Sequence, residues 1–76
     1  MRAENENVEH PSHYGGENDP FETIKVIHAW GLNFFLGNVV KYISRAGKKD
    51  PDKLVQDLKK ARFYLDYEIK RHEKKR

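Results

Sequence analysis

Hydrophobic residues recur at intervals of three or four positions in three segments of this chain, a spacing typical of amphipathic helices. The segments cover residues 19–31, 33–46 and 51–71. Two short stretches, residues 25–27 and 38–40, contain β-branched residues. Neither alternates between apolar and polar residues as a half-buried strand would, and both lie within stronger helical patterns. We therefore expect an all-α fold: a small three-helix domain with an ordered N-terminal loop and a long C-terminal helix.

The first predicted helix has signals at both ends. Asp19 is placed as its N-cap, Pro20 suits the first helical position, and Glu22 completes a capping box. Gly31 is expected to end the helix in a left-handed conformation. The apolar positions between them are Phe21, Ile24, Ile27 or His28, and Trp30.

The second predicted helix covers residues 33–46 and stops at Gly47. Its interior contains Gly37, which costs about 1 kcal/mol relative to alanine. Such a glycine allows close approach by another backbone or a ligand, or marks a late start of the helix. The expected apolar side consists of Leu36, Val39, Val40, Ile43 and Ala46.

The third predicted helix is the longest and covers residues 51–71. Asp50 is its expected N-cap, and Pro51 and Asp52 suit its first turn. Its apolar stripe consists of Leu54, Leu58, Ala61, Leu65 and Ile69. Because about 20 helical residues extend some 30 Å, part of this helix is expected to pack on another subunit.

Length and composition describe one small domain. We divide the 76 residues into a flexible N-terminus (1–9), a helical domain (10–71) and a basic tail (72–76). The chain has no cysteine, so disulfides and thiolate metal sites are excluded.

A core this small is marginal alone, and we expect a homo-oligomer. No export signal or membrane span is expected, which favours a cytoplasmic location.

The charge is divided unevenly along the chain. Residues 1–40 contain 2 Lys/Arg and 6 Asp/Glu, whereas residues 41–76 contain 13 Lys/Arg and 6 Asp/Glu. The basic half can attract a phosphate, a nucleotide or a nucleic acid. The alternative is a solvated helix face that continues into a basic tail.

A row of polar residues runs along one face of the second predicted helix. Asn38, Lys41 and Arg45 are spaced by three and four residues and share a face, and Lys48 lies just past the helix end. One amide and three cations can bind a phosphate, because arginine offers a planar fork and lysine a mobile charge. The alternative is again an ordinary solvated face.

Two further groups of residues are candidates for ligand contacts. In the N-terminal loop, His10, His13 and Tyr14 can contact a nucleobase or a phosphate; the alternative is that Tyr14 packs and His13 caps the backbone. The two histidines lack well-spaced further ligands, so no metal site is expected.

The other group lies on the third helix, where Asp57, Lys60 and Tyr64 share a face. Asp57 can pair with Arg45 or Lys41, or form an exposed pair with Lys60 worth a few tenths of a kcal/mol. Tyr64, with Phe63 and Tyr67, is expected to pack or to make oligomer contacts. The sequence has no P-loop, no dinucleotide-binding glycine motif and no zinc motif.

Three motifs in this order resemble a small tailed-phage domain family of unknown function. They are His-Pro-Ser-His-Tyr at residues 10–14, Gly-Asn-x-x-Lys-Tyr-Ile-x-Arg-Ala-Gly-Lys-Lys at 37–49, and Asp-Leu-x-Lys-Ala-x-x-Tyr-Leu at 57–65. A similar domain occurs in a phage nucleoside-monophosphate kinase that lacks a P-loop. The resemblance implies a nucleotide ligand and gives weight to His10, His13, Tyr14, Asn38, Lys41, Arg45, Lys48, Asp57 and Lys60.

The leading hypothesis is a phage protein, acting in the cytoplasm of an infected bacterium, that binds a nucleotide or a nucleotide-derived signal and sequesters it from host defence. In this hypothesis the pockets lie at subunit junctions and need no cofactor. One alternative is a nucleoside-monophosphate kinase, which would need ATP and Mg²⁺. A nucleic-acid-binding or protein-interaction module is a third possibility, and a steep loss of affinity with salt would identify nucleic-acid binding.

Overall fold

A computed structural model of the chain describes residues 17–74, in which three α-helices and one short 3₁₀-helix occur and no strand is found. The helices are α2 (Thr23–Ala29), α3 (Phe34–Arg45) and α4 (Leu54–Glu73), with η3 (Pro51–Lys53) immediately before α4. The all-α prediction is confirmed. The expected N-terminal loop lies outside the described residues.

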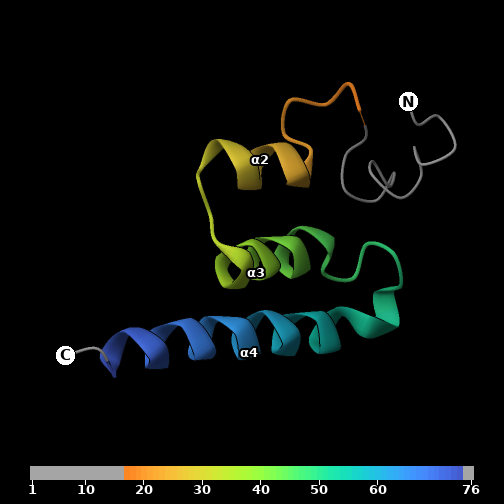
Figure 1. The fold of residues 1–76 in the computed structure, drawn as a ribbon. Helices are drawn as coiled ribbons and strands as arrows, with labels where there is room; N and C mark the ends of the chain where they lie inside the picture. The colour runs from red at the N-terminus through yellow and green to blue at the C-terminus, as the bar shows by residue number, and fades with distance from the viewer. Residues whose placement is uncertain (1–16, 75–76) are drawn as a thin grey trace, which may run out of the picture.

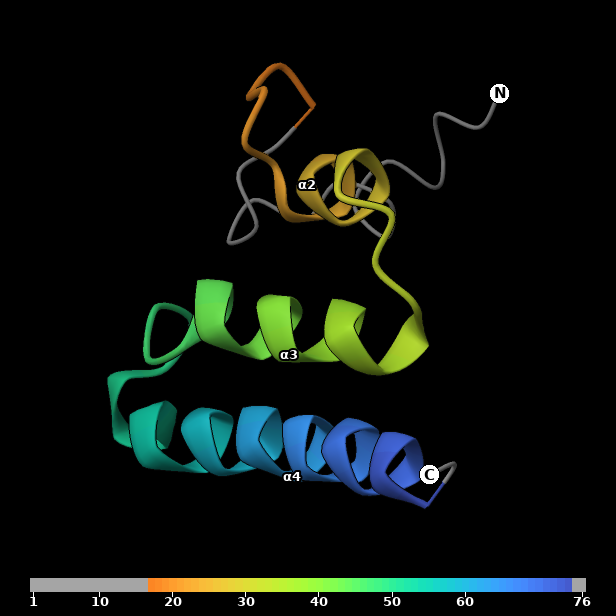
Figure 2. The same ribbon diagram turned by 90° about the vertical axis from the view of Figure 1, so that its left-hand side faces the viewer.

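The helices form three layers with α3 in the middle. Figure 1 shows α2 on one side of α3 and α4 on the other, and the second view agrees (Figure 2). In Figure 2, α3 and α4 run antiparallel along much of their length, whereas α2 crosses α3 steeply. No helix in residues 17–74 has both the length and the apolar content that a membrane crossing requires.

The segment before α2 corrects the predicted start of the first helix. The carboxylate of Asp19 accepts the N–H of Phe21 (2.8 Å), and the Asp19 carbonyl accepts the N–H of Glu22 (3.0 Å). These bonds close a turn, and α2 begins only at Thr23. Asp19 therefore caps a turn rather than the helix, because its side chain satisfies a local N–H before helical geometry is established.

The link from α2 to α3 follows the predicted signals. The N–H of Leu32 bonds to the Ile27 carbonyl and that of Gly31 to the His28 carbonyl, both at 3.1 Å. With Gly31 at φ +65°, these bonds form a Schellman motif. Asn33 then caps α3, because its side chain accepts the N–H of Leu36 at 2.9 Å.

The turn from α3 to α4 depends on Gly47 and Asp50. Gly47 has φ +72° and lies against Leu54, so a Cβ atom there would be 3.2 Å from the Leu54 Cβ. The Asp50 carboxylate accepts the N–H of Asp52 (3.0 Å) and caps η3. Asp50 is thus a cap as predicted, although the first turn after it is a 3₁₀ turn and α4 starts at Leu54.

Two glycine substitutions separate backbone strain from packing at these helix ends. We expect Gly31→Ala to cost about 1–2 kcal/mol of stability, which is the left-handed penalty alone, since nothing lies within 4 Å of its added Cβ. Gly47→Ala should cost more, because its Cβ also presses on Leu54. Urea unfolding of both variants tests this; an equal loss would refute the packing contribution.

The interface between α3 and α4 differs from the predicted apolar stripe. The residues of α4 that are buried are Asp57, Ala61 and Glu68, and Tyr64 is half-buried. Of the five residues predicted to face the core, only Ala61 is buried; Leu54, Leu58, Leu65 and Ile69 remain 41–46% exposed. The helix is turned so that α3 covers only one edge of the stripe.

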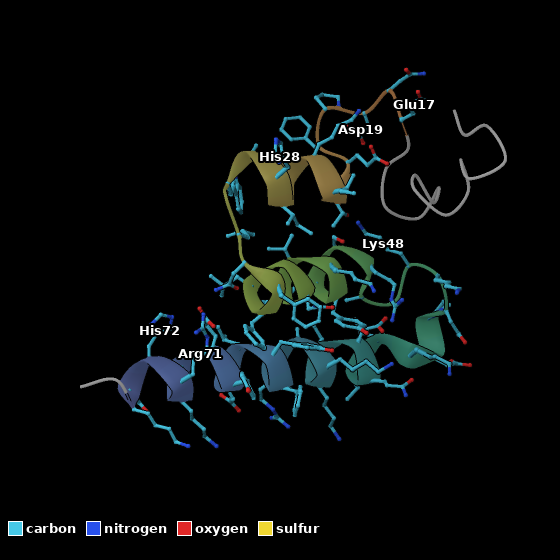
Figure 3. All side chains as sticks on the ribbon, in the orientation of Figure 1. Glu17, Asp19, His28, Lys48, Arg71 and His72 are labelled. Atoms are coloured by element: carbon cyan, nitrogen blue, oxygen red, sulfur yellow. The ribbon has the colours of Figure 1, made fainter. Side chains whose placement is uncertain are left out.

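Polar clamps hold the two ends of this helical pair. At one end, Arg45 Nη2 lies 3.1 Å from Asp57 Oδ1. At the other end, Asn33 Nδ2 donates to Glu68 Oε2 (2.8 Å), and Arg71 and His72 also contact Glu68 (2.7 and 2.9 Å). Figure 3 labels Arg71 and His72 at this end of α4.

Aromatic rings occupy the space between the two clamps. Tyr42 stacks on Tyr64 with centroids 6.0 Å apart, and Phe35 stacks on Tyr67 at 4.7 Å. The edge of Phe34 meets the ring of Tyr64 at 6.0 Å. Tyr64 and Tyr67 therefore pack on α3 of the same chain, as predicted, whereas Phe63, which was predicted with them, remains 63% exposed.

The described residues bury few hydrophobic side chains. Among the hydrophobic residues of this part of the chain, only Val39 and Ala61 are buried. Helix α2 adds a small contact with α3, where the Ile27 side chain lies over Gly37 and Thr23 shares a 2.9 Å hydrogen bond with Ser44. Gly37 thus makes room for a side chain of the neighbouring helix, whereas the sequence predicted room for a backbone or a ligand, or a late helix start.

Candidate functional site

A basic depression lies where the turn after α3 meets η3 and the beginning of α4. Its volume is about 260 Å³. Its walls combine the last residue of α3 with residues from the turn and from the first turns of α4. The lining side chains are Arg45, Lys49, Asp50, Lys53, Gln56, Asp57 and Lys60.

Asp57 fixes Arg45, one of the cations that line this depression. One carboxylate oxygen accepts the Arg45 guanidinium (3.1 Å), and the other accepts the backbone N–H of Gly47 (3.3 Å). Burial raises the pKa of Asp57, but the Gly47 N–H and the Arg45 charge outweigh it and hold the pKa below its ordinary value. The carboxylate therefore stays ionised and orients Arg45.

Three cations surround the ring of Tyr42 beside the depression. The Arg45 guanidinium lies 4.8 Å from the ring centroid, and the ammonium groups of Lys41 and Lys60 lie at 5.3 and 5.5 Å. These distances permit cation–π attraction, which holds the positive charges near one another. Because Tyr42 also stacks on Tyr64, the aromatic pair forms a rigid support for them.

The charge balance of the depression is positive. Its lining has four cationic side chains and two carboxylates, which leaves a net charge of +2. Both carboxylates accept hydrogen bonds from the protein, Asp57 from Arg45 and Gly47, and Asp50 from the N–H of Asp52. Chemically, this arrangement suits an anion with several oxygen atoms, such as a phosphate.

The structure brings together some of the predicted site residues. Arg45, Asp57 and Lys60 all line the depression, and Lys41 adjoins it through Tyr42. Asp57 pairs with Arg45, one of the pairings that the sequence left open.

Other predicted site residues are placed elsewhere. Asn38 donates its side-chain N–H to the Phe34 carbonyl (2.8 Å) within its own helix. Lys48 is exposed in the turn after α3 (Figure 3) and does not line the depression. His10, His13 and Tyr14 lie outside the described residues.

Four residues of the lining were not predicted as site residues from the sequence: Lys49, Asp50, Lys53 and Gln56. Lys49 and Lys53 lie on either side of the Asp50-Pro51 turn, so no helical periodicity connects them with Arg45. A usable signal did exist after the turn, because Lys53, Gln56 and Lys60 repeat at three and four residues, as neighbours on one helix face do. Tyr42 was missed because it was considered only as part of a motif.

The described part of the chain offers no cluster for a metal ion: within residues 17–74, no three His, Cys, Asp or Glu side chains gather closely enough to hold one. The donors at the depression are mainly ammonium and guanidinium groups, which repel a cation. The charges of its lining therefore suit an anion better than a cation.

Comparison with known proteins gives one match. No curated protein and no solved structure matches the chain. A family model described as a protein of unknown function, DUF3310, matches residues 8–66. The matched region contains all three motifs of the sequence analysis, α2, α3 and the depression, and it covers more than half of the chain. The chain therefore belongs to the DUF3310 family.

Proposed function

We propose that this chain binds a nucleotide or a nucleotide-derived signal, with the phosphate groups in the basic depression. The observation that carries the proposal is the convergence of Arg45, Lys49, Lys53 and Lys60 on one concave surface. Asp57 holds Arg45 in place before a ligand arrives, so less conformational entropy is lost on binding.

The size of the depression suits the phosphate part of such a ligand. Pockets that enclose a whole small molecule have volumes of about 300–1,000 Å³, and this one has about 260 Å³. A nucleoside would then extend beyond it. Lys41 and the Tyr42–Tyr64 pair lie beside the depression, and in the proposal His13 and Tyr14 complete the contacts with the base.

Binding without catalysis agrees best with the contacts of Asp57. A kinase built on these residues would need Asp57 or His13 to assist proton transfer or to hold Mg²⁺. The hydrogen bonds that Asp57 accepts from Arg45 and Gly47 lower its pKa and make the carboxylate a weaker base, and the adjacent Arg45 charge opposes a second cation there. We therefore propose a ligand-sequestering protein rather than a kinase. Its resemblance to a phage domain family supports a role in an infected bacterium, where capture of a nucleotide signal would oppose host defence.

Calorimetric titration of the full chain with nucleoside mono-, di- and triphosphates, cyclic dinucleotides and inorganic phosphate tests this proposal. We expect saturable binding of at least one nucleotide, without turnover when ATP is added. A single-stranded oligonucleotide forms a second arm. Binding of the oligonucleotide alone, with a steep salt dependence, would overturn the proposal in favour of nucleic-acid binding.

Neighbouring lysines on α4 provide a matched pair of variants. Lys60 lines the depression, whereas Lys59 is exposed on another face of the same helix. Hydrogen bonds to charged groups contribute about 1.5–3 kcal/mol, so Lys60→Ala should weaken nucleotide binding about tenfold or more. Lys59→Ala removes the same charge and should change the affinity little. Equal losses would indicate general charge attraction and no defined site.

A further inference from the structure

The face of the α3–α4 pair opposite the basic depression is apolar. On α4, Leu54, Leu58, Leu65 and Ile69 are 41–46% exposed, and on α3, Ile43 is 56% exposed. The four residues of α4 are separated by four, seven and four positions, so they follow one line along about four turns of helix. Arg62 is exposed and borders this line, four residues after Leu58 and three before Leu65.

Helical rotation places this apolar face away from the ligand site. Each helical residue turns the chain by about 100°. Lys60 comes two residues after Leu58, and Arg45 comes two residues after Ile43, so each cation points nearly opposite to its apolar neighbour. Because Lys60 and Arg45 both line the depression, the apolar side chains of both helices belong to the other side of the pair.

We propose that this apolar face binds the same face of a second copy of the chain. The two α3–α4 pairs then form a four-helix bundle, with one basic depression on each outer side. The proposal is independent of which ligand the depression takes.

The shortage of core is the first argument for a second copy. Val39 and Ala61 are the hydrophobic residues that residues 17–74 bury, and a chain of this length has little other means of stabilisation. Exposed apolar patches of more than a few hundred Å² mark interaction sites. A protein that needs such a cover to stay folded obtains it most dependably from its own copy, since many dimeric proteins have no stable monomer.

The area of the face agrees with a dimer. Helix α4 has 20 residues, a length of about 30 Å, and packed helices lie about 8–10 Å apart. Helix α3 has 12 residues and is therefore about 18 Å long, so the outer face of the two helices measures on the order of 500 Å² in projection. A standard interface buries about 800 Å² of accessible surface per partner, which a projected area of this size can supply.

The distribution of charge also favours association through the apolar face. The opposite side bears Lys41, Arg45 and Lys60, and pairing two such surfaces would bring like charges together at a cost. Association through the apolar face keeps the two depressions apart and accessible. Ligand binding and assembly therefore use different sides of the chain.

Sedimentation of the full chain over a wide range of concentrations tests the proposal directly. We expect a dimer, and a melting temperature that rises with protein concentration because dissociation accompanies unfolding. A chain that is monomeric at every concentration, with a constant melting temperature, would overturn the proposal. That result would indicate that another segment of the chain or a different protein covers the face.

Two glutamate substitutions on α4 locate the interface. Leu65→Glu places charges in the centre of the proposed contact and should give a monomer, with a dissociation constant raised at least a hundredfold. Phe63→Glu alters a residue that is 63% exposed on another side of α4 and should remain dimeric. If only Phe63→Glu gives a monomer, the dimer uses a different surface. If Leu65→Glu fails to fold, the concentration dependence of the wild-type melting temperature decides the question.

Discussion

Replacing Asp57 with alanine is expected to lower the melting temperature by several degrees and to weaken nucleotide binding in the same variant. The carboxylate joins α4 to the end of α3 through Arg45 and to the following turn through Gly47. Its loss leaves the Arg45 guanidinium without this partner and frees the turn that positions Lys49. Thermal unfolding measures the first effect, and calorimetric titration measures the second.

Asp57→Asn is the control for this variant. Asparagine has nearly the same shape and still offers one oxygen to the Gly47 N–H, but it lacks the charge that holds Arg45. We expect an intermediate loss of stability and a loss of affinity close to that of the alanine variant. If both variants bind nucleotide as tightly as the wild type, Asp57 does not position Arg45 for the ligand.

The second large effect concerns Glu68 and pH. Hydrogen bonds from Arg71 and Asn33 lower the pKa of Glu68 to about 2 despite its burial, and His72 adds to this shift. A carboxyl group whose pKa is lower in the folded state than in the unfolded state stabilises the fold when it is ionised. This contribution is fully present above the ordinary pKa and is lost as the pH falls towards 2.

Glu68→Gln should therefore be less stable than the wild type at neutral pH and less sensitive to acid. We expect the melting temperature of the wild type to fall steeply between about pH 5 and pH 2. That of Glu68→Gln should start several degrees lower and fall less, with a remaining slope from Asp57, whose pKa is also lowered. Melting curves across this pH range make the comparison.

Asp66 provides the control for charge, because it is exposed on the same helix. Asp66→Asn removes one carboxylate as Glu68→Gln does, and its stability should follow the wild-type pH profile. Parallel profiles for Glu68→Gln and the wild type would contradict the assigned role of Glu68 in holding the ends of α3 and α4 together.

The sequence predicted the helices well where local chemistry determines their ends. Gly31 and Gly47 both adopt positive φ and terminate helices, and Asn33 lies at the predicted start of the second helix and caps it. These signals depend on a few neighbouring backbone groups and need no tertiary contact. The signal at Asp19 was equally local, but it matched a turn as well as a helix, and the turn formed.

Burial was predicted less well, because periodicity does not show which element covers a stripe. The repeat of Leu54, Leu58, Leu65 and Ile69 correctly indicated an amphipathic helix. However, α3 packs beside this line and buries Asp57 and Glu68. Both carboxylates are accommodated there by hydrogen bonds from residues distant in sequence. The pairing of Glu68 with Asn33 becomes apparent only when the helices are placed next to each other.

The candidate site was predicted only in part, again because periodicity within one helix does not show which elements lie next to it. The pair of Arg45 and Asp57 was one of the pairings that the sequence offered, and the antiparallel arrangement of α3 and α4 selected it. Asn38 was predicted as a site residue because its spacing places it on one helix face with Lys41 and Arg45. Its amide instead donates to the Phe34 carbonyl one turn earlier. Lys49 and Lys53 join the site because the turn at Asp50 and Pro51 folds them towards Arg45.

The central claim is that phosphate groups of a nucleotide bind in the basic depression. Nuclear magnetic resonance spectra of the full chain, labelled with nitrogen-15 and titrated with the nucleotides named above, test it most directly. We predict saturable shifts of backbone amides in residues 45–60, with little change in α2. No saturable shift with any nucleotide, or shifts confined to α2 or to the end of α4, would contradict the account.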